Sequence, residues 1–331
     1  MRFAIKKVSF YPKIALLASL LAFIVIGLGA YTRLTDAGLS CPDWPVCYGY
    51  ITAPHTPMQI KNAAQLYPAT PINTTKAWTE MIHRYLAGAE SLLIIFLILT
   101  APRQLRASPC TLNGIRLALV LLLGSQVVLG MLTVTLKLTP VIVLGHLLTG
   151  LTLMSVLWWL FLISVQTPPV QAVRNTSVTF SGSRYITMAI WLGFIILFTQ
   201  ISLGGWVSTH YAGLACIDFP FCNGQWIPPL HLQQFTSDLI TIHMLHRLGA
   251  LLTAVYLSLL ALVLLWKTTF RHVGSVLLAL LITQVLLGII NILWLRPVWI
   301  ALAHNMVATA MLISLVTLLV RNHQKQQRGA I

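Results

Sequence analysis

Two short segments that are rich in ionisable residues begin apolar stretches of this chain. Their ionisable side chains are of the kinds that bind metals or move protons. They read EMIHR at residues 80–84 and HMLHR at residues 243–247. Both contain a His-Arg pair, and they differ where Glu80 is matched by His243. The shared pair predicts two related sites, and the difference predicts that only the first site carries out a reaction.

Two further histidines, His146 and His304, lie near the ends of later apolar stretches. At 1.5 Å per helical residue they would sit at about the depth of His83 and His246. Two imidazoles from different helices can clamp a haem iron, so one haem is predicted in each half of the chain. Hydrogen bonding between helices is an alternative role for membrane histidines. Zinc is another, and it would need more ligands, for which His243 is a candidate.

The charged neighbours of these histidines suggest further roles. Arg84 and Arg247 are predicted to pair with haem propionates, although snorkelling to the membrane surface would also explain them. Glu80 lies three residues before His83 on the same helical face, where a carboxylate can move protons beside a haem. The alternative is an acid near a helix start that pairs with Arg84. Glu90 lies on that face too, as a proton relay or a buried hydrogen-bonded acid.

The composition predicts an integral membrane protein. Only 8% of the 331 residues are charged and 57% are hydrophobic, whereas soluble domains have about 25% charged residues. The apolar runs are continuous, which indicates helices rather than a barrel. Eight spans are expected at about 14–32, 80–100, 115–136, 141–165, 185–207, 239–266, 273–294 and 298–320, each near the ~20 residues that cross a bilayer.

The net charge of +15 follows from topology rather than from nucleic-acid binding. Most cations fall in the tails and alternate loops, and the positive-inside rule then places both termini in the cytoplasm. These cations are Arg2, Lys6, Lys7, Lys13, Arg103, Arg106, Arg116, Arg174, Arg184, Lys267, Arg271, Arg321, Lys325 and Arg328. No nucleic-acid partner is expected, and the basic excess would attract anionic lipid.

The second half of the chain repeats the first. Residues 213–222 correspond to residues 38–47, and the motif QVLLG at 284–288 corresponds to QVVLG at 126–130. His304 corresponds to His146. Each half contains four spans, so both enter the membrane from the same side. The predicted fold is therefore an all-α membrane protein of two parallel four-helix repeats, 1–166 and 167–331, about an axis along the membrane normal.

Four of the five cysteines form two closely spaced pairs. Cys41 and Cys47 lie in the first outer loop, and Cys216 and Cys222 lie in the second. Both loops face the oxidising side in the predicted topology, so a disulfide is expected in each. One could be a structural staple and the other redox-active. Cys110, in an inner loop, is expected to be a free thiol.

Together, these motifs resemble the haem A synthase family in its bacterial form with paired loop cysteines. The resemblance spans nearly the whole chain. It implies oxidation of the C8 methyl group of haem O to a formyl group, which gives haem A for terminal oxidases. It further implies that His83 and His146 face the substrate haem, that His246 and His304 ligate a haem b cofactor, and that Glu80 is catalytic. The Cys41/Cys47 pair falls on the pair linked to activity in members that have it.

The resemblance also implies a location and partners. The protein would lie in the bacterial inner membrane with its cysteine loops extracytoplasmic. It would receive haem O from haem O synthase and supply terminal haem-copper oxidase assembly. The electron donor is not named by the sequence, and a homo-oligomer is compatible with it. Two rival hypotheses stay open: a dihaem b-type, quinol-linked electron-transfer subunit, and a parallel-repeat transporter without haem.

Overall fold

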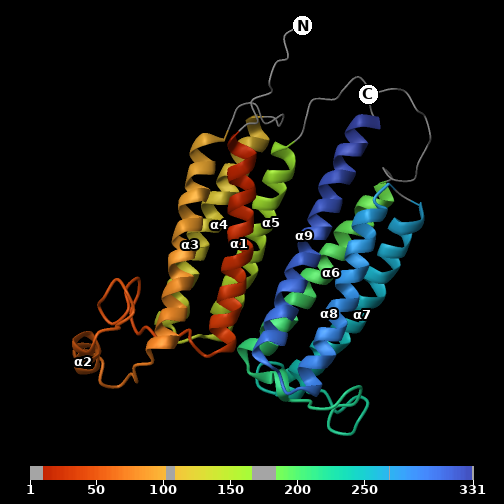
Figure 1. The fold of residues 1–331 in the computed structure, drawn as a ribbon. Helices are drawn as coiled ribbons and strands as arrows, with labels where there is room; N and C mark the ends of the chain where they lie inside the picture. Colours follow the sequence, from red (N-terminus) through yellow and green to blue (C-terminus); the bar gives the residue numbers. More distant parts are fainter. Residues whose placement is uncertain (1–9, 102–108, 166–183, 268, 330–331) are drawn as a thin grey trace.

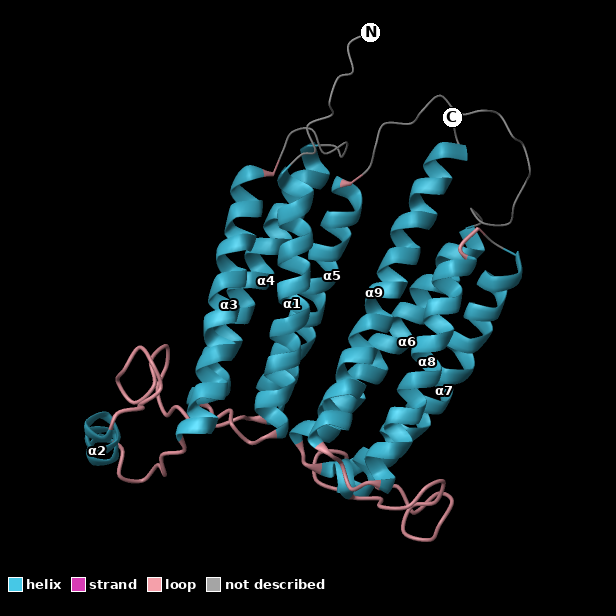
Figure 2. Cartoon of the chain, in the orientation of Figure 1, coloured by secondary structure: helices cyan, strands magenta, loops and turns pink. Residues whose placement is uncertain are grey.

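The computed structural model describes residues 10–101, 109–165, 184–267 and 269–329, and within these ranges the secondary structure is helical. Figure 2 shows long helices joined by loops, with no strand in the described chain. The long helices are α1 (Phe10–Leu34), α3 (Thr74–Thr100), α4 (Pro109–Thr135), α5 (Pro140–Ser164), α6 (Arg184–Thr209), α7 (Leu239–Lys267), α8 (Arg271–Leu293) and α9 (Val298–Gly329). All eight are long and apolar enough to cross a membrane, which confirms the predicted multi-pass architecture.

The second span begins earlier than the hydropathy predicted. α3 starts at Thr74, where the side chain of Asn73 caps it by accepting a hydrogen bond from the backbone N–H of Lys76 (3.0 Å). The added first turns are polar, so an apolar run does not detect them. Glu80 therefore lies inside the helix rather than at its start, and an interaction with the helix N-terminus does not explain its position.

A short helix in the first cysteine-containing loop was not predicted. α2 (Pro57–Leu66) begins with a capping box, in which Thr56 and Gln59 satisfy each other's backbone N–H groups. Together with the loop around Cys41 and Cys47, it packs over the start of α3. The first loop is thus a folded cap on the membrane helices.

The long helices form two groups of four that stand side by side (Figure 1). One group contains α1, α3, α4 and α5, and the other contains α6–α9. They meet where α1 and α5 pack against α9 and where α5 packs against α6. Both cysteine loops lie at the same end, which is the lower end in Figure 1. The predicted boundary at residues 166–167 and the side chain of Cys110 lie outside the part described, as do the predicted cytoplasmic cations Arg2, Lys6, Lys7, Arg103, Arg106 and Arg174.

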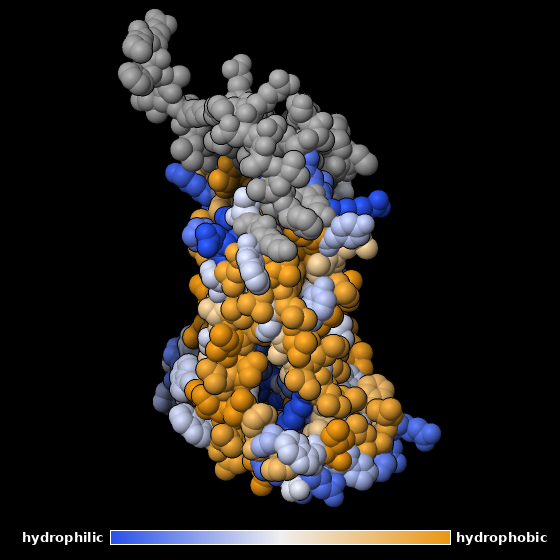
Figure 3. Space-filling view, turned by 90° about the vertical axis from the view of Figure 1, so that its right-hand side faces the viewer, coloured by the Kyte–Doolittle hydropathy of each residue, from blue (hydrophilic) through white to orange (hydrophobic). Residues whose placement is uncertain are grey.

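Each group has an apolar core away from its cysteine loop. In the first group the core includes Ala15, Leu97 and Leu157, and in the second it includes Leu264 and Leu277. The histidines lie towards the opposite ends of the same helices. Figure 3 shows a largely apolar face with a hollow nearer the loop end, and hydrophilic atoms form the floor of that hollow. Apolar packing therefore joins the helices at one end, and polar side chains occupy the other.

Candidate functional site

The four predicted histidines come together as two pairs. His83 on α3 lies near His146 on α5, and His246 on α7 lies near His304 on α9. All four are partly buried. Among the described residues, no three His, Cys, Asp or Glu side chains gather as a metal cluster would require. The arrangement is two imidazoles from two helices in each half, which is the donor set of a bis-histidine haem.

A glycine on a neighbouring helix makes room for each of these imidazoles. A methyl group added at Gly29 would lie 3.0 Å from the ring of His83, and one at Gly204 would lie 3.0 Å from the ring of His246. The corresponding distances are 3.4 Å at Gly130 for His146 and 3.2 Å at Gly288 for His304. The repeated QVxLG motif indicated the last two glycines without revealing their role, and the first two were missed.

The buried ring nitrogens also fit a metal-binding role. Nδ1 of His83, of His146 and of His304 is buried and has no hydrogen-bond partner within the described chain. Buried polar atoms are nearly always paired, so three unpaired imidazole nitrogens in matched places need an explanation. Rings that are packed in glycine niches, three of them with an unpaired Nδ1, suit a planar iron-containing ligand between the helices.

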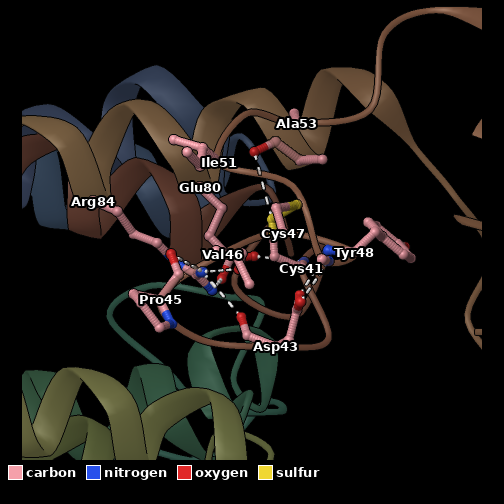
Figure 4. The surroundings of a disulfide bond; sticks show 12 residues. Cys41, Asp43, Pro45, Val46, Cys47, Tyr48, Ile51, Ala53, Glu80 and Arg84 are labelled. Carbon is pink, nitrogen blue, oxygen red and sulfur yellow. Dashed lines mark hydrogen bonds and ion pairs between the residues drawn. A yellow bond between two sulfur atoms is a disulfide. The ribbon is translucent and has the colours of Figure 1, made fainter. Parts of the chain in front are cut away.

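Glu80 is one of the most enclosed acids in the described chain, with 4% of its surface exposed. One carboxylate oxygen pairs with the guanidinium of Arg84, the contact one helical turn away that the alternative, non-catalytic interpretation of Glu80 predicted. The other accepts a hydrogen bond from the backbone N–H of Cys41 (3.0 Å). Figure 4 shows Glu80 between Arg84 and the disulfide loop. The loop thus fixes the carboxylate on the helical face that carries His83.

At the matching position, His243 is equally buried but has a different partner. Its Nδ1 donates a hydrogen bond to the backbone oxygen of Ala212 (2.9 Å). An imidazole held this way helps to anchor the second loop, whereas Glu80 offers a carboxylate. The substitution that the sequence singled out is therefore a real difference in chemistry between two similar surroundings.

Each arginine after a histidine binds backbone carbonyls of its own cysteine loop. Arg84 donates to the oxygens of Asp43 (3.0 Å), Pro45 (3.3 Å) and Val46 (2.7 Å). Arg247 donates to those of Cys216 (2.9 Å), Asp218 (3.0 Å) and Phe221 (2.7 Å). These contacts were not predicted, and they give both arginines a structural role in anchoring the loops. The propionate contact stays a prediction.

Both predicted disulfides form, Cys41–Cys47 and Cys216–Cys222, each with a Cα–Cα distance of 4.7 Å. All four cysteines are fully buried. Burial of this kind restricts access by an exchanging thiolate and favours a structural role for both bonds in this conformation.

An aspartate between the cysteines completes each loop, and the sequence reasoning missed both. Asp43 accepts hydrogen bonds from the N–H groups of Tyr48 (2.6 Å) and Gly49 (2.7 Å). Asp218 accepts them from Asn223 (2.7 Å) and Gly224 (2.8 Å). The N–H of Gly224, with smaller contributions that include Asn223 and Arg247, lowers the pKa of Asp218. The repeated pattern Cys-X-Asp-X-Pro-X-Cys-X-Gly was the available signal.

Two features distinguish the first half beyond these loops. Glu90 is buried on α3 (7% exposed) at the place that Thr253 occupies on α7. An apolar groove of about 370 Å³ also lies between α3 and α4, lined by Ile95, Ile98, Leu99, Val120, Leu123, Gly124 and Val127. The corresponding helices α7 and α8 pack closely, whereas α3 and α4 touch much less. The first half is therefore more open to the lipid side.

Comparison with known proteins agrees with the site. A family model described as the cytochrome oxidase assembly protein family COX15-CtaA matches residues 12–316. Among curated relatives, Heme A synthase of Shewanella oneidensis is 40% identical over 315 residues, covering 89% of this chain and 91% of the relative. Heme A synthase of Erythrobacter litoralis is 30% identical (89% and 91% covered), and that of Wolbachia from Culex pipiens is 29% identical (88% and 91% covered). With its paired histidines in two helical groups, the chain belongs to the COX15-CtaA family of cytochrome oxidase assembly proteins.

Proposed function

We propose that this chain is a haem A synthase, an oxidoreductase that converts the C8 methyl group of haem O to the formyl group of haem A for terminal oxidase assembly. The curated relatives that carry this name match the chain over most of their length. The observation that carries the proposal is the asymmetry of two otherwise matched sites. Both have paired histidines in glycine niches, but only the first adds a buried carboxylate, Glu80, beside its histidine.

The two sites then have different roles, one in binding substrate and the other in holding a cofactor. His83 and His146 bind the substrate haem in the half made of residues 1–166, and His246 and His304 hold haem b in residues 167–331. The extra acids of the first half and the lipid-facing groove beside it support this assignment. The second half offers a plain bis-histidine site with no acid at the position of Glu80, as expected for electron transfer. When bound, haem b supplies one-electron redox chemistry next to the substrate site.

Glu80 has the contacts of a positioned proton-transfer group. The N–H of Cys41 and the guanidinium of Arg84 fix its carboxylate, so it does not have to be ordered when substrate binds. Oxidation of a methyl group to a formyl group breaks C–H bonds and needs an oxidant that takes up the electrons, and a carboxylate on the face of His83 is placed to accept a proton at the substrate edge. Arg84 follows His83 and Arg247 follows His246, so each is a candidate to pair with the propionates of the haem in its half. Each would do so in addition to binding the loop carbonyls described above.

The groove between α3 and α4 suits the farnesyl tail of haem O. Ile95 lies 12 residues beyond His83 on α3, about 18 Å along the helix. An isoprenoid tail that leaves the inward edge of a haem at His83 would run along the membrane towards this apolar surface. With its propionates towards the cysteine loops and its tail in the groove, the substrate would have one orientation. The groove lies on the lipid-facing side of the first half, where an isoprenoid tail is soluble.

The predicted setting follows from this function. The protein lies in the bacterial inner membrane, with both termini cytoplasmic and both cysteine loops extracytoplasmic. Haem O synthase supplies its substrate, and terminal haem-copper oxidase assembly uses its product. The cations described at the ends opposite the cysteine loops, such as Arg184 and Arg271, support this orientation.

The direct test is production of haem A. The chain is co-expressed with haem O synthase in a bacterium that lacks its own haem A synthase, and extracted haems are separated by chromatography. Haem A is expected with both enzymes and haem O alone with the synthase only. A purified protein with a Soret band but two fixed haems b, and no haem A in the cells, would support the dihaem electron-transfer alternative instead.

A further inference from the structure

A glutamine side chain touches the imidazole of His246. The amide nitrogen of Gln200 on α6 lies 2.9 Å from Nδ1 of His246 and 3.0 Å from its backbone oxygen. The amide oxygen of Gln200 is buried and has no partner within the described chain. Gln200 therefore joins α6 to α7 at the candidate ligand and has one acceptor atom to spare there.

The first half has a valine at the corresponding place. Gly29 and Gly204 make the same contact with His83 and His246, which aligns α1 with α6 and sets Val25 against Gln200. In both halves the backbone oxygen at this position lies near the histidine ring. A valine side chain adds no polar group, and Nδ1 of His83 is buried without a hydrogen bond to any described residue.

The second histidine of each pair also has a different glutamine contact, but not at its outer nitrogen. The amide nitrogen of Gln284 lies 3.1 Å from Nε2 of His304 and leaves Nδ1 of His304 without a partner in the described chain. Its counterpart Gln126 bonds instead to the hydroxyl of Thr149 and to the backbone oxygen of His146 (3.0 Å). Thr149 corresponds to Val307 in the second half, so the diverting hydroxyl is specific to the first. Glutamine side chains thus contact both imidazoles of the second half and neither imidazole of the first.

A hydrogen bond to the outer nitrogen changes how an imidazole binds iron. A ligating histidine that coordinates through Nε2 keeps its proton on Nδ1, and an acceptor there fixes the tautomer and the ring orientation. It also makes the imidazole a stronger electron-pair donor to the iron, and loss of such a partner lowers metal affinity by about 10- to 100-fold. Turning the amide of Gln200 about its last bond would place its unpaired oxygen beside Nδ1 as that acceptor, in exchange for the hydrogen bond to the backbone oxygen of His246.

We propose that Gln200 is a positioning residue that makes His246 a permanent haem ligand, and that Val25 leaves His83 free to bind and release a substrate haem. The inference rests on the proposed function and goes one step further. It names the side chains that turn one copy of a duplicated site into a cofactor site and the other into an exchange site. Gln200 acts through His246, without touching the reacting atoms.

The test uses the full-length protein purified in detergent with its haem. Gln200→Met keeps the length of the side chain but removes its hydrogen bonds. Haem b transfer to excess apomyoglobin is expected to be about 10-fold faster or more. The midpoint potential should rise, and the reduced haem should begin to bind carbon monoxide. Gln126→Met is the matched control, because it removes a glutamine that bonds to a histidine backbone but not to a ring, and these three readouts should stay unchanged.

The reverse substitution tests the same idea in the first half. Val25→Gln is expected to raise the fraction of protein that keeps a second haem through purification, and it does so even if Gln200→Met fails to fold. Unchanged haem b transfer and potential in Gln200→Met, or an equal change in Gln126→Met, would overturn the proposal, as would no gain in Val25→Gln. A wild-type protein without any haem would instead overturn the proposed function.

Discussion

The two halves of this molecule build the same frame and complete it differently. In each, an arginine after a histidine binds carbonyls of a disulfide loop, and a glycine opposite each histidine makes room for its ring. The first half then adds Glu80, whereas the second has His243 at that position and the amide of Gln200 against His246. In the proposed function, these differences affect proton transfer in the first half and the retention of haem in the second.

The packing of the helices differs in the same sense. α7 and α8 close the second half, whereas α3 and α4 leave an apolar groove in the first. A cofactor that stays bound needs no passage, but a lipid-soluble substrate must enter and leave. This difference in packing is what the proposed function requires if the first half exchanges its haem and the second retains it.

The largest expected effect comes from removing a ligand of the retained haem. His246→Ala or His304→Ala should abolish most of the haem b in purified protein, because one imidazole holds haem far less tightly than two. His83→Ala and His146→Ala are the matched variants and should keep haem b while losing haem A formation. The pyridine haemochrome spectrum measures this. Loss of haem b only in the His83 and His146 variants would reverse the assignment of the halves.

The next effect concerns the carboxylate that only one half possesses. Glu80→Gln keeps the size and the hydrogen-bonding ability of the side chain but removes its basicity. Haem A formation should fall by about 100-fold or more, with the haem b spectrum intact. His243→Gln, the control at the matching position, should change haem A formation by less than about 10-fold, because its contact is to a loop carbonyl. Normal haem A yield in Glu80→Gln would rule out the catalytic role.

The two disulfide loops should respond unequally. Paired Cys41→Ser and Cys47→Ser substitutions loosen the backbone N–H that holds Glu80, so haem A formation should fall by about 10-fold, the value of one such hydrogen bond. Paired Cys216→Ser and Cys222→Ser substitutions should cost about 2 kcal/mol of local loop stability with little change in haem A formation. Thermal unfolding and haem analysis of both double variants separate these outcomes. Equal loss of haem A formation in the two double variants would contradict a specific role of the first loop in holding Glu80.

A smaller effect is expected at the groove. A side chain at Gly124 would meet no described atom within 4 Å of its Cβ, so Gly124→Phe should fold while filling the space proposed for the farnesyl tail. Haem O bound after co-expression should drop a few-fold, since part of an apolar contact is lost, and haem b should be unaffected. Gly114→Phe, on the same helix and equally open, serves as the control. Equal haem O content in both variants would show that the farnesyl tail does not occupy this groove.

Much of this arrangement could be predicted from the sequence because its signals are local or repeated. Continuous apolar runs mark eight spans, and the His-Arg repeat marks the paired sites. The pairing of Glu80 with Arg84 followed from helical periodicity alone. Both disulfides followed from the spacing of their cysteines.

The remainder depends on contacts that no local pattern encodes. The polar first turns of α3 placed the helix start six residues before Glu80, because hydropathy does not register a capped polar turn. The anchoring of the loops by Arg84 and Arg247 joins residues some 26 to 41 positions apart. Gln200 reaches His246 across 46 positions, and neither Gln200 nor Val25 belongs to a motif that the sequence repeats.

In the proposed function, one half of the protein exchanges its haem and the other keeps it. The most direct measurement is extraction and chromatography of the haems bound to purified wild-type protein, expressed with and without haem O synthase. A constant amount of haem b is expected in both preparations, with haem O and haem A appearing as a second component only when haem O synthase is present. Two equivalents of haem b in both preparations, with no haem O or haem A, would contradict it.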